Sequence, residues 1–135
     1  MELKSLDNLL KLIEIDLQEK AVSKLNSKGV SHANSLIEAG KVKTPSSWER
    51  PSVETENAYI KENGWGEFSK WFLGVDPSEG NETKGHYGYI YTSDFKTVDR
   101  QALRAIRQRS AQRGLKSIFA AAGKMIVKID GEEND

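Results

Sequence analysis

Arginine is the residue type whose spacing in this 135-residue chain most clearly suggests a function. Arg100, Arg104 and Arg107 follow one another at i, i+4 and i+7, and Arg109 and Arg113 form a neighbouring i, i+4 pair. Like charges at these helical spacings repel, so we expect anions to neutralise them. Guanidinium groups can make two parallel hydrogen bonds to a carboxylate or a phosphate. The candidate anion-binding or partner-binding residues are therefore Arg100, Arg104, Arg107, Arg109 and Arg113.

The positive charge of the chain is concentrated in the segment that contains these arginines. The chain has 20 Lys and Arg against 20 Asp and Glu, and its net charge is zero. Residues 96–128 nevertheless carry nine basic residues and the single acid Asp99, so they hold a charge of +8 and the rest of the chain −8. The basic segment either faces an external acidic partner, such as nucleic acid, or folds against the acidic N-terminal part.

A row of tyrosines is the second candidate binding feature. Tyr87, Tyr89 and Tyr91 alternate with Gly88 and Ile90, a period of two that predicts a strand with all three rings on one face, about 6.6 Å apart. Exposed rings at this spacing could stack on bases. The alternative is that the row packs against a helix, with its hydroxyl groups reaching solvent or a carbonyl.

Catalytic and metal-binding patterns are sparse. The chain has no cysteine, which excludes disulfides, thiolate zinc sites and cysteine nucleophiles. Its two histidines, His32 and His86, lack the i+3 or i+4 partners of a helical metal site, so we predict no metal and no cofactor. His86 could act as a general base oriented by Asp94 across a hairpin, which leaves a small enzyme as the third functional hypothesis.

The elements that must position these residues are mainly helices. Capping residues, apolar spacing and glycine stops predict helices over about 5–29, 31–40, 52–63, 65–74, 99–112 and 117–130. The helix at 99–112 begins at Thr97 or Asp99 and stops before Gly114. A short β-hairpin is expected around residues 86–98, with 86–91 as one strand and 95–98 as the return. The predicted fold class is mainly α (α+β).

The chain is expected to be a single domain over residues 1–130. Within it, residues 1–40 form an N-terminal helical hairpin, 52–130 form a unit with an aromatic core, and 131–135 are a disordered acidic tail. The segment Trp65–Gly74 (WGEFSKWFLG) supplies four aromatic residues and is predicted to be the centre of the core. No stretch has the length of a membrane span or the pattern of a signal peptide, so we expect a cytoplasmic protein.

The first predicted helix is apolar on more than one side. Leucines and isoleucines at spacings of three and four form one stripe, and Leu12 and Ile15 lie outside it. We expect this surface to contact a partner or a second copy of the chain. The stripe comprises Leu6, Leu9, Leu10, Ile13 and Leu17.

The second half of the chain resembles a group of small bacterial and phage proteins. The shared order of features is Trp71–Pro77 (WFLGVDP), then Glu82–Tyr91 (ETKGHYGYIY), then Arg107–Gly114 (RQRSAQRG). Gly88 and Ile90 stand where that pattern has lysine and proline. Modules attached to phage prohead proteases are similar to a lesser degree. The resemblance implies a module of phage or mobile-element origin and implies no particular chemistry.

These observations favour a non-catalytic interaction module that docks an acidic protein or associates with itself through its N-terminal helix. The alternative is a nucleic-acid-binding protein that uses the arginine-rich helix at 99–113.

Overall fold

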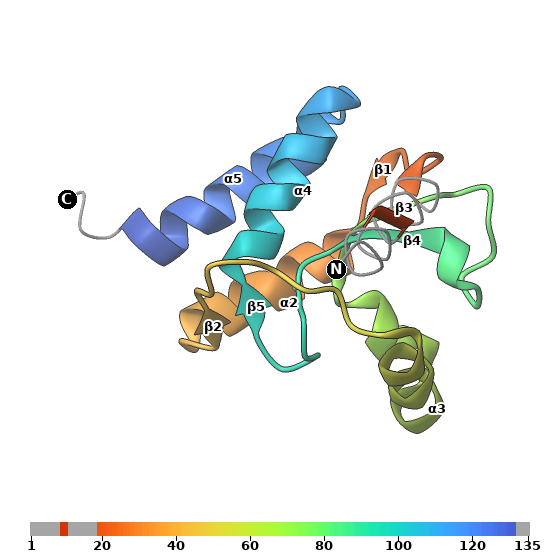
Figure 1. Cartoon of the computed structure of the whole chain (residues 1–135). Helices are drawn as coiled ribbons and strands as arrows, with labels where there is room; N and C mark the ends of the chain where they lie inside the picture. The colour runs from red at the N-terminus through yellow and green to blue at the C-terminus, as the bar shows by residue number, and fades with distance from the viewer. Residues whose placement is uncertain (1–8, 11–18, 132–135) are drawn as a thin grey trace.

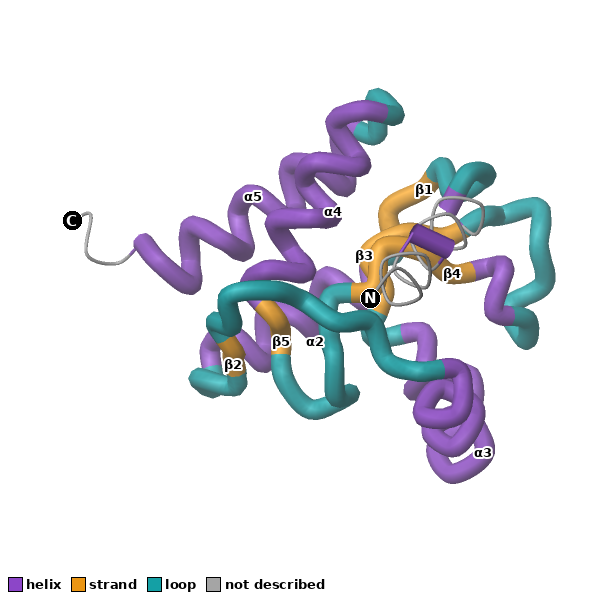
Figure 2. The backbone as a smooth tube through the Cα atoms, in the orientation of Figure 1, coloured by secondary structure: helices purple, strands orange, loops and turns teal. Residues whose placement is uncertain are grey.

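The computed structural model describes residues 9–10 and 19–131, which form an α+β fold of four helices and two small sheets (Figures 1 and 2). The mainly helical α+β class expected from the sequence is confirmed. No helix in the described ranges is long and apolar enough to cross a membrane. The helices are α2 (Ser27–Glu38), α3 (Val53–Ser69), α4 (Arg100–Gln112) and α5 (Lys116–Asp130), with a short 3-10 turn at Lys84–His86. The strands are β1 (Lys24–Leu25), β2 (Val42–Lys43), β3 (Phe72–Val75), β4 (Tyr87–Ile90) and β5 (Val98–Asp99).

The larger sheet is antiparallel and has the order β1-β3-β4. Gly74 and Gly88 face each other across β3 and β4. A Cβ atom on either glycine would come within 2.7 Å of the side chain of Val22. The absence of two side chains thus forms a notch in the sheet, and Val22, 3% exposed, fills it. This contact holds the segment before β1 against the sheet.

The expected hairpin at residues 86–98 is wrong in its pairing. β4 does form where it was predicted, but its partner is β3, with Phe72 opposite Ile90. The return segment β5 pairs instead with β2, in parallel. The loop between them, residues 91–97, turns away because Asp94 organises it through local hydrogen bonds. The alternating residues of 86–91 predict a strand. They do not predict which strand it pairs with, because the partner is distant in sequence.

The helix boundaries near the N-terminus also differ from those predicted. Gly29 does not stop the first helix but lies inside α2, which begins at Ser27. A Cβ atom at Gly29 would lie 1.8 Å from the carbonyl oxygen of Phe72, so the glycine allows close approach of α2 to β3. Residues 24–25 form a strand instead of the expected helical hairpin over residues 1–40. Residues 1–8 and 11–18 of that expected hairpin lie outside the described residues, and α2 supplies its second helix.

The predicted aromatic core is confirmed, although its local structure differs. Trp71 is 4% exposed and Phe72 is fully buried. The predicted break at Gly64 is present as a kink with φ of 88°, yet α3 continues to Ser69. Phe72 then lies in β3 and not in a helix. The side chain of Trp71 packs among the rings of His32, Tyr91 and Phe95.

The two C-terminal helices form an antiparallel hairpin that turns at Gly114, where φ is 70°. Figure 1 shows α4 and α5 side by side at the upper left, β1, β3 and β4 at the right, and α3 at the lower right. The α4–α5 hairpin and α3 therefore lie on different sides of the fold.

Candidate functional site

The arginine helix is held in place by its first residues and its apolar side. Asp99, at the N-cap of α4, accepts hydrogen bonds from the backbone N–H groups of Gln101 at 2.9 Å and Ala102 at 3.1 Å. Burial raises the pKa of the Asp99 carboxyl. The two hydrogen bonds act in the opposite direction but do not outweigh burial. Leu103 and Ile106 are fully buried. The predicted helix with an Asp99 cap and a stop at Gly114 is therefore confirmed.

Arg100 binds the other end of the hairpin. Its guanidinium group donates to both carboxylate oxygens of Asp130, with Nε–Oδ1 at 2.9 Å and Nη2–Oδ2 at 2.5 Å. These hydrogen bonds lower the pKa of Asp130 and raise that of Arg100. Since Asp130 is the last residue of α5, this pair joins the start of α4 to the end of α5. Arg100 is therefore not available to an external anion in this conformation.

Arg109 and Arg113 face inward, toward Glu19. Arg109 donates from Nε to Oε1 at 2.8 Å and from Nη2 to Oε2 at 3.0 Å, and Arg113 Nη1 lies 3.4 Å from Oε1. The same carboxylate accepts the backbone N–H of Tyr89 at 2.9 Å. Glu19 is fully buried. In this cluster the buried Glu19 carboxylate is surrounded by two guanidinium groups and one backbone amide. All of these donors come from residues 89–113.

Arg104 and Arg107 are the two arginines of the set that face solvent and form no ion pair in the described part of the chain. The guanidinium group of Arg107 lies 4.5 Å from the centre of the Phe119 ring, so its stem packs across α5. The five arginines predicted as one binding set therefore separate into three structural residues and two exposed ones. The folded helix turns through 100° per residue, and this rotation carries Arg109 and Arg113 to the inner side.

The tyrosine row does not form an exposed stacking surface. Tyr87 is 3% exposed, and Tyr89 and Tyr91 are fully buried, so the alternative that the row packs inside is the correct one. Their hydroxyl groups are all used: Tyr87 donates to the Asn81 carbonyl, Tyr91 donates to the Lys70 carbonyl, and Tyr89 accepts from Arg113. Burial raises the pKa of all three phenols.

Tyr89 also breaks the expected alternation. Its φ is 66°, in the left-handed region, and its ring lies close to the position a Gly74 Cβ would occupy. Tyr87 instead packs with Phe68 and Phe72. The predicted common face is wrong because the backbone reverses the side chain at Tyr89, where the Glu19 carboxylate binds the freed N–H.

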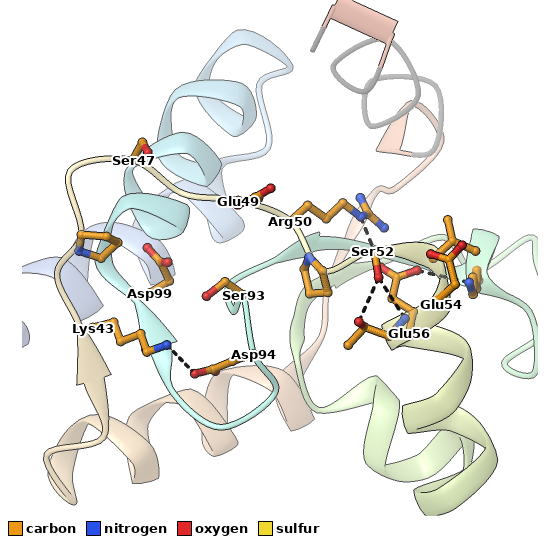
Figure 3. Close-up of a pocket in the computed structure, with 15 residues that line it drawn as sticks. Lys43, Ser47, Glu49, Arg50, Ser52, Glu54, Glu56, Ser93, Asp94 and Asp99 are labelled. Atoms are coloured by element: carbon orange, nitrogen blue, oxygen red, sulfur yellow. Dashed lines mark hydrogen bonds and ion pairs between the residues drawn. The ribbon is translucent and has the colours of Figure 1, made fainter. Parts of the chain in front are cut away.

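A groove of about 930 Å³, lined by many charged residues, lies between the loop before α3 and the loop after β4 (Figure 3). Its floor contains Glu56, 3% exposed, which binds Arg50 at 3.3 Å and Lys84 at 3.2 Å. Glu49 and Glu54 stand at its rim. The sequence patterns did not identify this groove, because its walls come from three separate segments.

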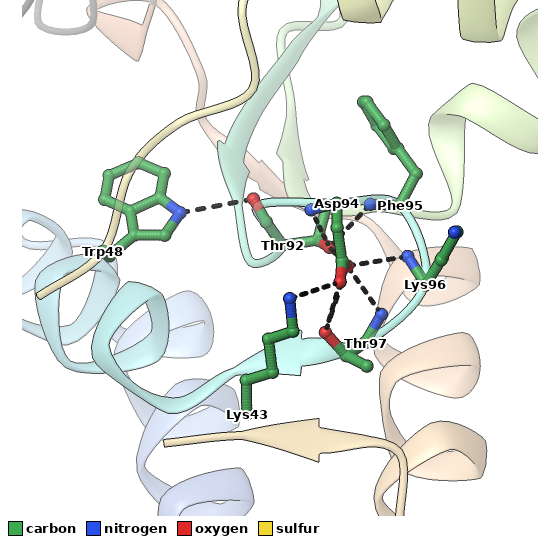
Figure 4. A network of polar contacts seen from close by, with 7 residues as sticks. All are labelled: Lys43, Trp48, Thr92, Asp94, Phe95, Lys96 and Thr97. Carbon is green, nitrogen blue, oxygen red and sulfur yellow. Dashed lines mark hydrogen bonds and ion pairs between the residues drawn. The ribbon is translucent and has the colours of Figure 1, made fainter. Parts of the chain in front are cut away.

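Asp94 organises the loop after β4, which forms one wall of this groove (Figure 4). Its carboxylate accepts from the backbone N–H groups of Lys96 and Thr97, each at 2.9 Å, and lies 2.8 Å from Nζ of Lys43. Burial by itself would raise the pKa of Asp94, but the hydrogen bonds from Lys43, Lys96 and Thr97 outweigh it and lower the pKa to about 2. Thr92 accepts the N–H of Phe95 at 3.0 Å and completes the turn.

The proposed pairing of His86 with Asp94 is not formed. Nδ1 of His86 lies 2.7 Å from the carbonyl oxygen of Glu79, and its ring packs against Tyr87. Asp94 instead takes its partners from its own loop and from Lys43. The other histidine, His32, packs edge-on against Trp71, and burial lowers its pKa. Residues 9–10 and 19–131 contain no group of three or more His, Cys, Asp or Glu side chains that could hold a metal ion.

Sequence reasoning identified the arginines but not their internal acceptor. The charge balance indicated that the acidic N-terminal part could neutralise them, and Glu19 does so for Arg109 and Arg113. Nothing in the local pattern distinguishes Glu19 from the other N-terminal acids.

Comparisons with protein-family models, with curated proteins and with solved structures find no match to this chain.

Proposed function

We propose that this chain is a non-catalytic binding module that docks an acidic protein surface through the outer face of the α4–α5 hairpin. The observation that carries the proposal is a set of exposed cations on two packed helices, which we call the basic hairpin face. Its members are Arg104, Arg107, Lys116, Lys124 and Lys128. The one acid between residues 100 and 130 is Asp130, and Arg100 already binds it.

Two of these residues, Arg104 and Arg107, lie along the junction of the two helices, and Lys128 donates to Asn34 of α2 at 3.3 Å. Arg107 lies across α5 at Phe119, and its side chain also approaches Gly123 within 3.3 Å of a Cβ position. Arg104 exerts its charge on Asp130. Both arginines therefore face the stripe of α5 that runs through Gly123, Val127 and Asp130, and Val127 is 60% exposed. An apolar centre surrounded by cations is typical of a protein-docking surface.

An acidic protein is favoured over nucleic acid by the burial of the tyrosines. The predicted single-stranded site needed exposed rings beside the arginines, and Tyr89 and Tyr91 are fully buried. Two of the five arginines also bind Glu19 instead of facing outward. The lack of cysteine agrees with action in a reducing compartment such as the cytoplasm.

The proposal is tested by titrating the protein against a fluorescein-labelled polyglutamate peptide at about 25 mM salt, where exposed charges are weakly screened. Binding should weaken about tenfold in the double variant Arg104→Glu, Arg107→Glu, since exposed charge pairs each contribute modestly. The matched control Lys41→Glu, Lys61→Glu has the same net charge and changes exposed lysines outside the hairpin, so its affinity should stay near that of the wild type.

No peptide binding, or equal loss in both double variants, would refute the proposal. Single-stranded and double-stranded DNA and RNA serve as further arms of the titration. Much tighter binding to one of them, with a log–log salt slope of about −0.7 to −0.9 per contacted phosphate, would support the nucleic-acid alternative instead.

A further inference from the structure

The kink of α3 contains the only Asn-Gly pair of the sequence, Asn63 followed by Gly64. Gly64 has φ of 88° and ψ of 167° inside an otherwise helical run. A residue with a side chain rarely adopts that φ, so the kink itself requires glycine at this position. A Cβ atom built on Gly64 would meet no other atom within 4 Å, which means that the requirement comes from the backbone and not from close packing.

The side chain of Asn63 is exposed at this kink. Among the described residues its amide makes one hydrogen bond, from Nδ2 to the main-chain oxygen of Tyr59 at 3.1 Å. Figure 1 shows α3 at the lower right of the molecule, away from the α4–α5 hairpin. The amide of Asn63 can therefore change its rotamer without opening the core, because a single exposed hydrogen bond holds it.

We propose that Asn63 is a site of spontaneous deamidation, in which the main chain of the protein is itself the nucleophile. The main-chain nitrogen of Gly64 attacks Cγ of Asn63 and forms a new N–Cγ bond. The Cγ–Nδ2 bond breaks, and the side-chain nitrogen leaves as ammonia with the proton of the Gly64 N–H group. The product of this step is a five-membered succinimide ring. The inference does not rest on the docking function proposed above.

Solvent water completes the reaction by opening the ring at one of its two carbonyl carbons. Opening at Cγ restores the main chain and leaves aspartate at position 63. Opening at the main-chain carbonyl carbon leaves isoaspartate, in which the chain runs through the Cβ and Cγ atoms of the former side chain. Overall, one water molecule is consumed and one ammonia molecule is released, and a neutral amide becomes a carboxylate.

Glycine favours this reaction because it has no side chain to hinder the approach of its nitrogen to Cγ. The chain provides two comparisons. Asn57 is exposed in the same helix but is followed by Ala58, and Asn81 is exposed in a loop but is followed by Glu82. Each of these next residues carries a Cβ atom, so both asparagines should react more slowly than Asn63.

The pair Asp130–Gly131 provides a third comparison, since an aspartate before glycine can form the same ring with loss of water. Arg100 binds both carboxylate oxygens of Asp130, and these hydrogen bonds lower the pKa of that carboxyl. An ionised carboxylate is a poor electrophile, so Asp130 should stay intact under conditions that convert Asn63.

Deamidation weakens α3 at its kink. The amide of Asn63 donates to the Tyr59 carbonyl, whereas a carboxylate has no proton to donate and repels that oxygen. The new negative charge also lies at the C-terminal end of the first helical run of α3, where the helix dipole disfavours it. Tyr59 belongs to the aromatic core, because its ring stacks on Phe95 and its hydroxyl accepts the indole N–H of Trp71. The reaction at the surface therefore lowers the stability of the core.

Peptide mapping of the full, folded chain by mass spectrometry tests the proposal. Samples are incubated at several pH values between about 6 and 9, and each deamidated peptide gains about 1 Da. Conversion at Asn63 should be at least about tenfold faster than at Asn57 and Asn81, and it should accelerate with pH because the attacking nitrogen must lose its proton. The product should contain isoaspartate as well as aspartate, since only the ring yields both.

Three results would overturn the proposal. The first is an equal rate at the three asparagines, and the second is conversion of Asn63 to aspartate alone, which indicates direct hydrolysis. The third is conversion that begins only in denaturant, since the fold would then protect the amide. These measurements use the wild-type chain and do not depend on how a variant folds.

Two variants complete the test. Asn63→Gln should gain no mass at this position, because a glutamine side chain would have to form a six-membered ring, which closes far more slowly. Asn63→Asp reproduces the new charge, so it should melt at a lower temperature than the wild type. Asn57→Asp is its matched control, since it adds the same charge nearer the N-terminus of α3, where the dipole favours it. Equal melting temperatures in the two aspartate variants would overturn the effect assigned to the kink.

Discussion

Glu19 is the acidic side chain on which the inner part of the arginine helix depends. Its carboxylate has four donors, from Arg109, Arg113 and the backbone of Tyr89, and its side chain is 1% exposed. The side chains of the two arginines are about one-fifth exposed. A buried carboxylate of this kind contributes little net stability as a pair, but its removal takes the neutralising negative charge away from two guanidinium groups.

We therefore expect Glu19→Gln to lower the free energy of unfolding by about 3 kcal/mol. The exposed pair of Arg100 with Asp130 provides the control, because Asp130→Asn should cost less than about 1 kcal/mol. Urea denaturation of the wild type and both variants measures the difference. Equal losses in the two variants would contradict the structural role assigned to Glu19.

Asp94 makes stability depend on pH in a defined range. Its pKa in the folded chain is about 2, below the value of an unfolded aspartate near 4. The folded state therefore favours the ionised form, and the stabilisation is present above about pH 4 and is lost as the pH falls toward 2. Asp94→Asn should remove this part of the acid sensitivity.

The measurement for Asp94 is the free energy of unfolding of both proteins between about pH 5 and pH 2. The wild type should be the more stable at pH 5, and the difference should shrink as the carboxylate is protonated. A difference that stays constant over the whole range would show that the carboxylate charge does not organise the turn.

At the scale of elements, glycines determine how closely the segments approach. Gly29 brings α2 against β3, and Gly74 with Gly88 makes room for Val22. These contacts join the start of the described chain to the sheet. The N–H of Ser23 and the N–H of Asn26 extend the same attachment through hydrogen bonds to the carbonyls of Val75 and Leu73.

Gly88→Ala should destabilise the protein by about 1–3 kcal/mol, because the new Cβ would crowd Val22 in a packed site. Combining it with Val22→Ala should cost less than the sum of the two single changes, because the smaller side chain vacates the space. Gly80→Ala is the matched control, since a Cβ there meets nothing within 4 Å. Thermal or urea unfolding of the four variants measures these changes in stability. If the losses from Gly88→Ala and Val22→Ala simply add in the double variant, Val22 does not fill the space left by Gly88.

At the scale of the molecule, one aromatic cluster connects elements that are distant in sequence. Trp71 contacts His32 from α2, Tyr91 after β4 and Phe95 in the following loop, and its indole N–H donates to the hydroxyl of Tyr59 in α3. The loss of this ring therefore affects most of the fold at once.

Trp71→Ala should lower the free energy of unfolding by about 3–5 kcal/mol, enough to unfold a large fraction of a small domain. Trp65→Ala is the comparison, since that ring is only partly buried and should cost less. Circular dichroism during heating measures both. An unchanged melting temperature in Trp71→Ala would contradict the central position of this ring.

Several features followed from the sequence by itself because their causes are local. The Asp99 cap, the stop at Gly114 and the spacing of Leu103 and Ile106 define α4 within a few residues of each other. Dense aromatic residues identified the core at Trp71 and Phe72. The mainly helical α+β class followed from the same short-range signals.

Only the tertiary structure decided which arginines are exposed and which strands pair. The partner of Arg109 lies 90 residues away at Glu19, and β4 pairs with β3 across a polar loop. Periodicity places side chains on a common face but does not say what covers that face, so the tyrosine row could not be assigned to the interior in advance. The charge imbalance along the chain was visible in the sequence. Its division into internally paired and exposed cations required the positions of residues that folding brings together.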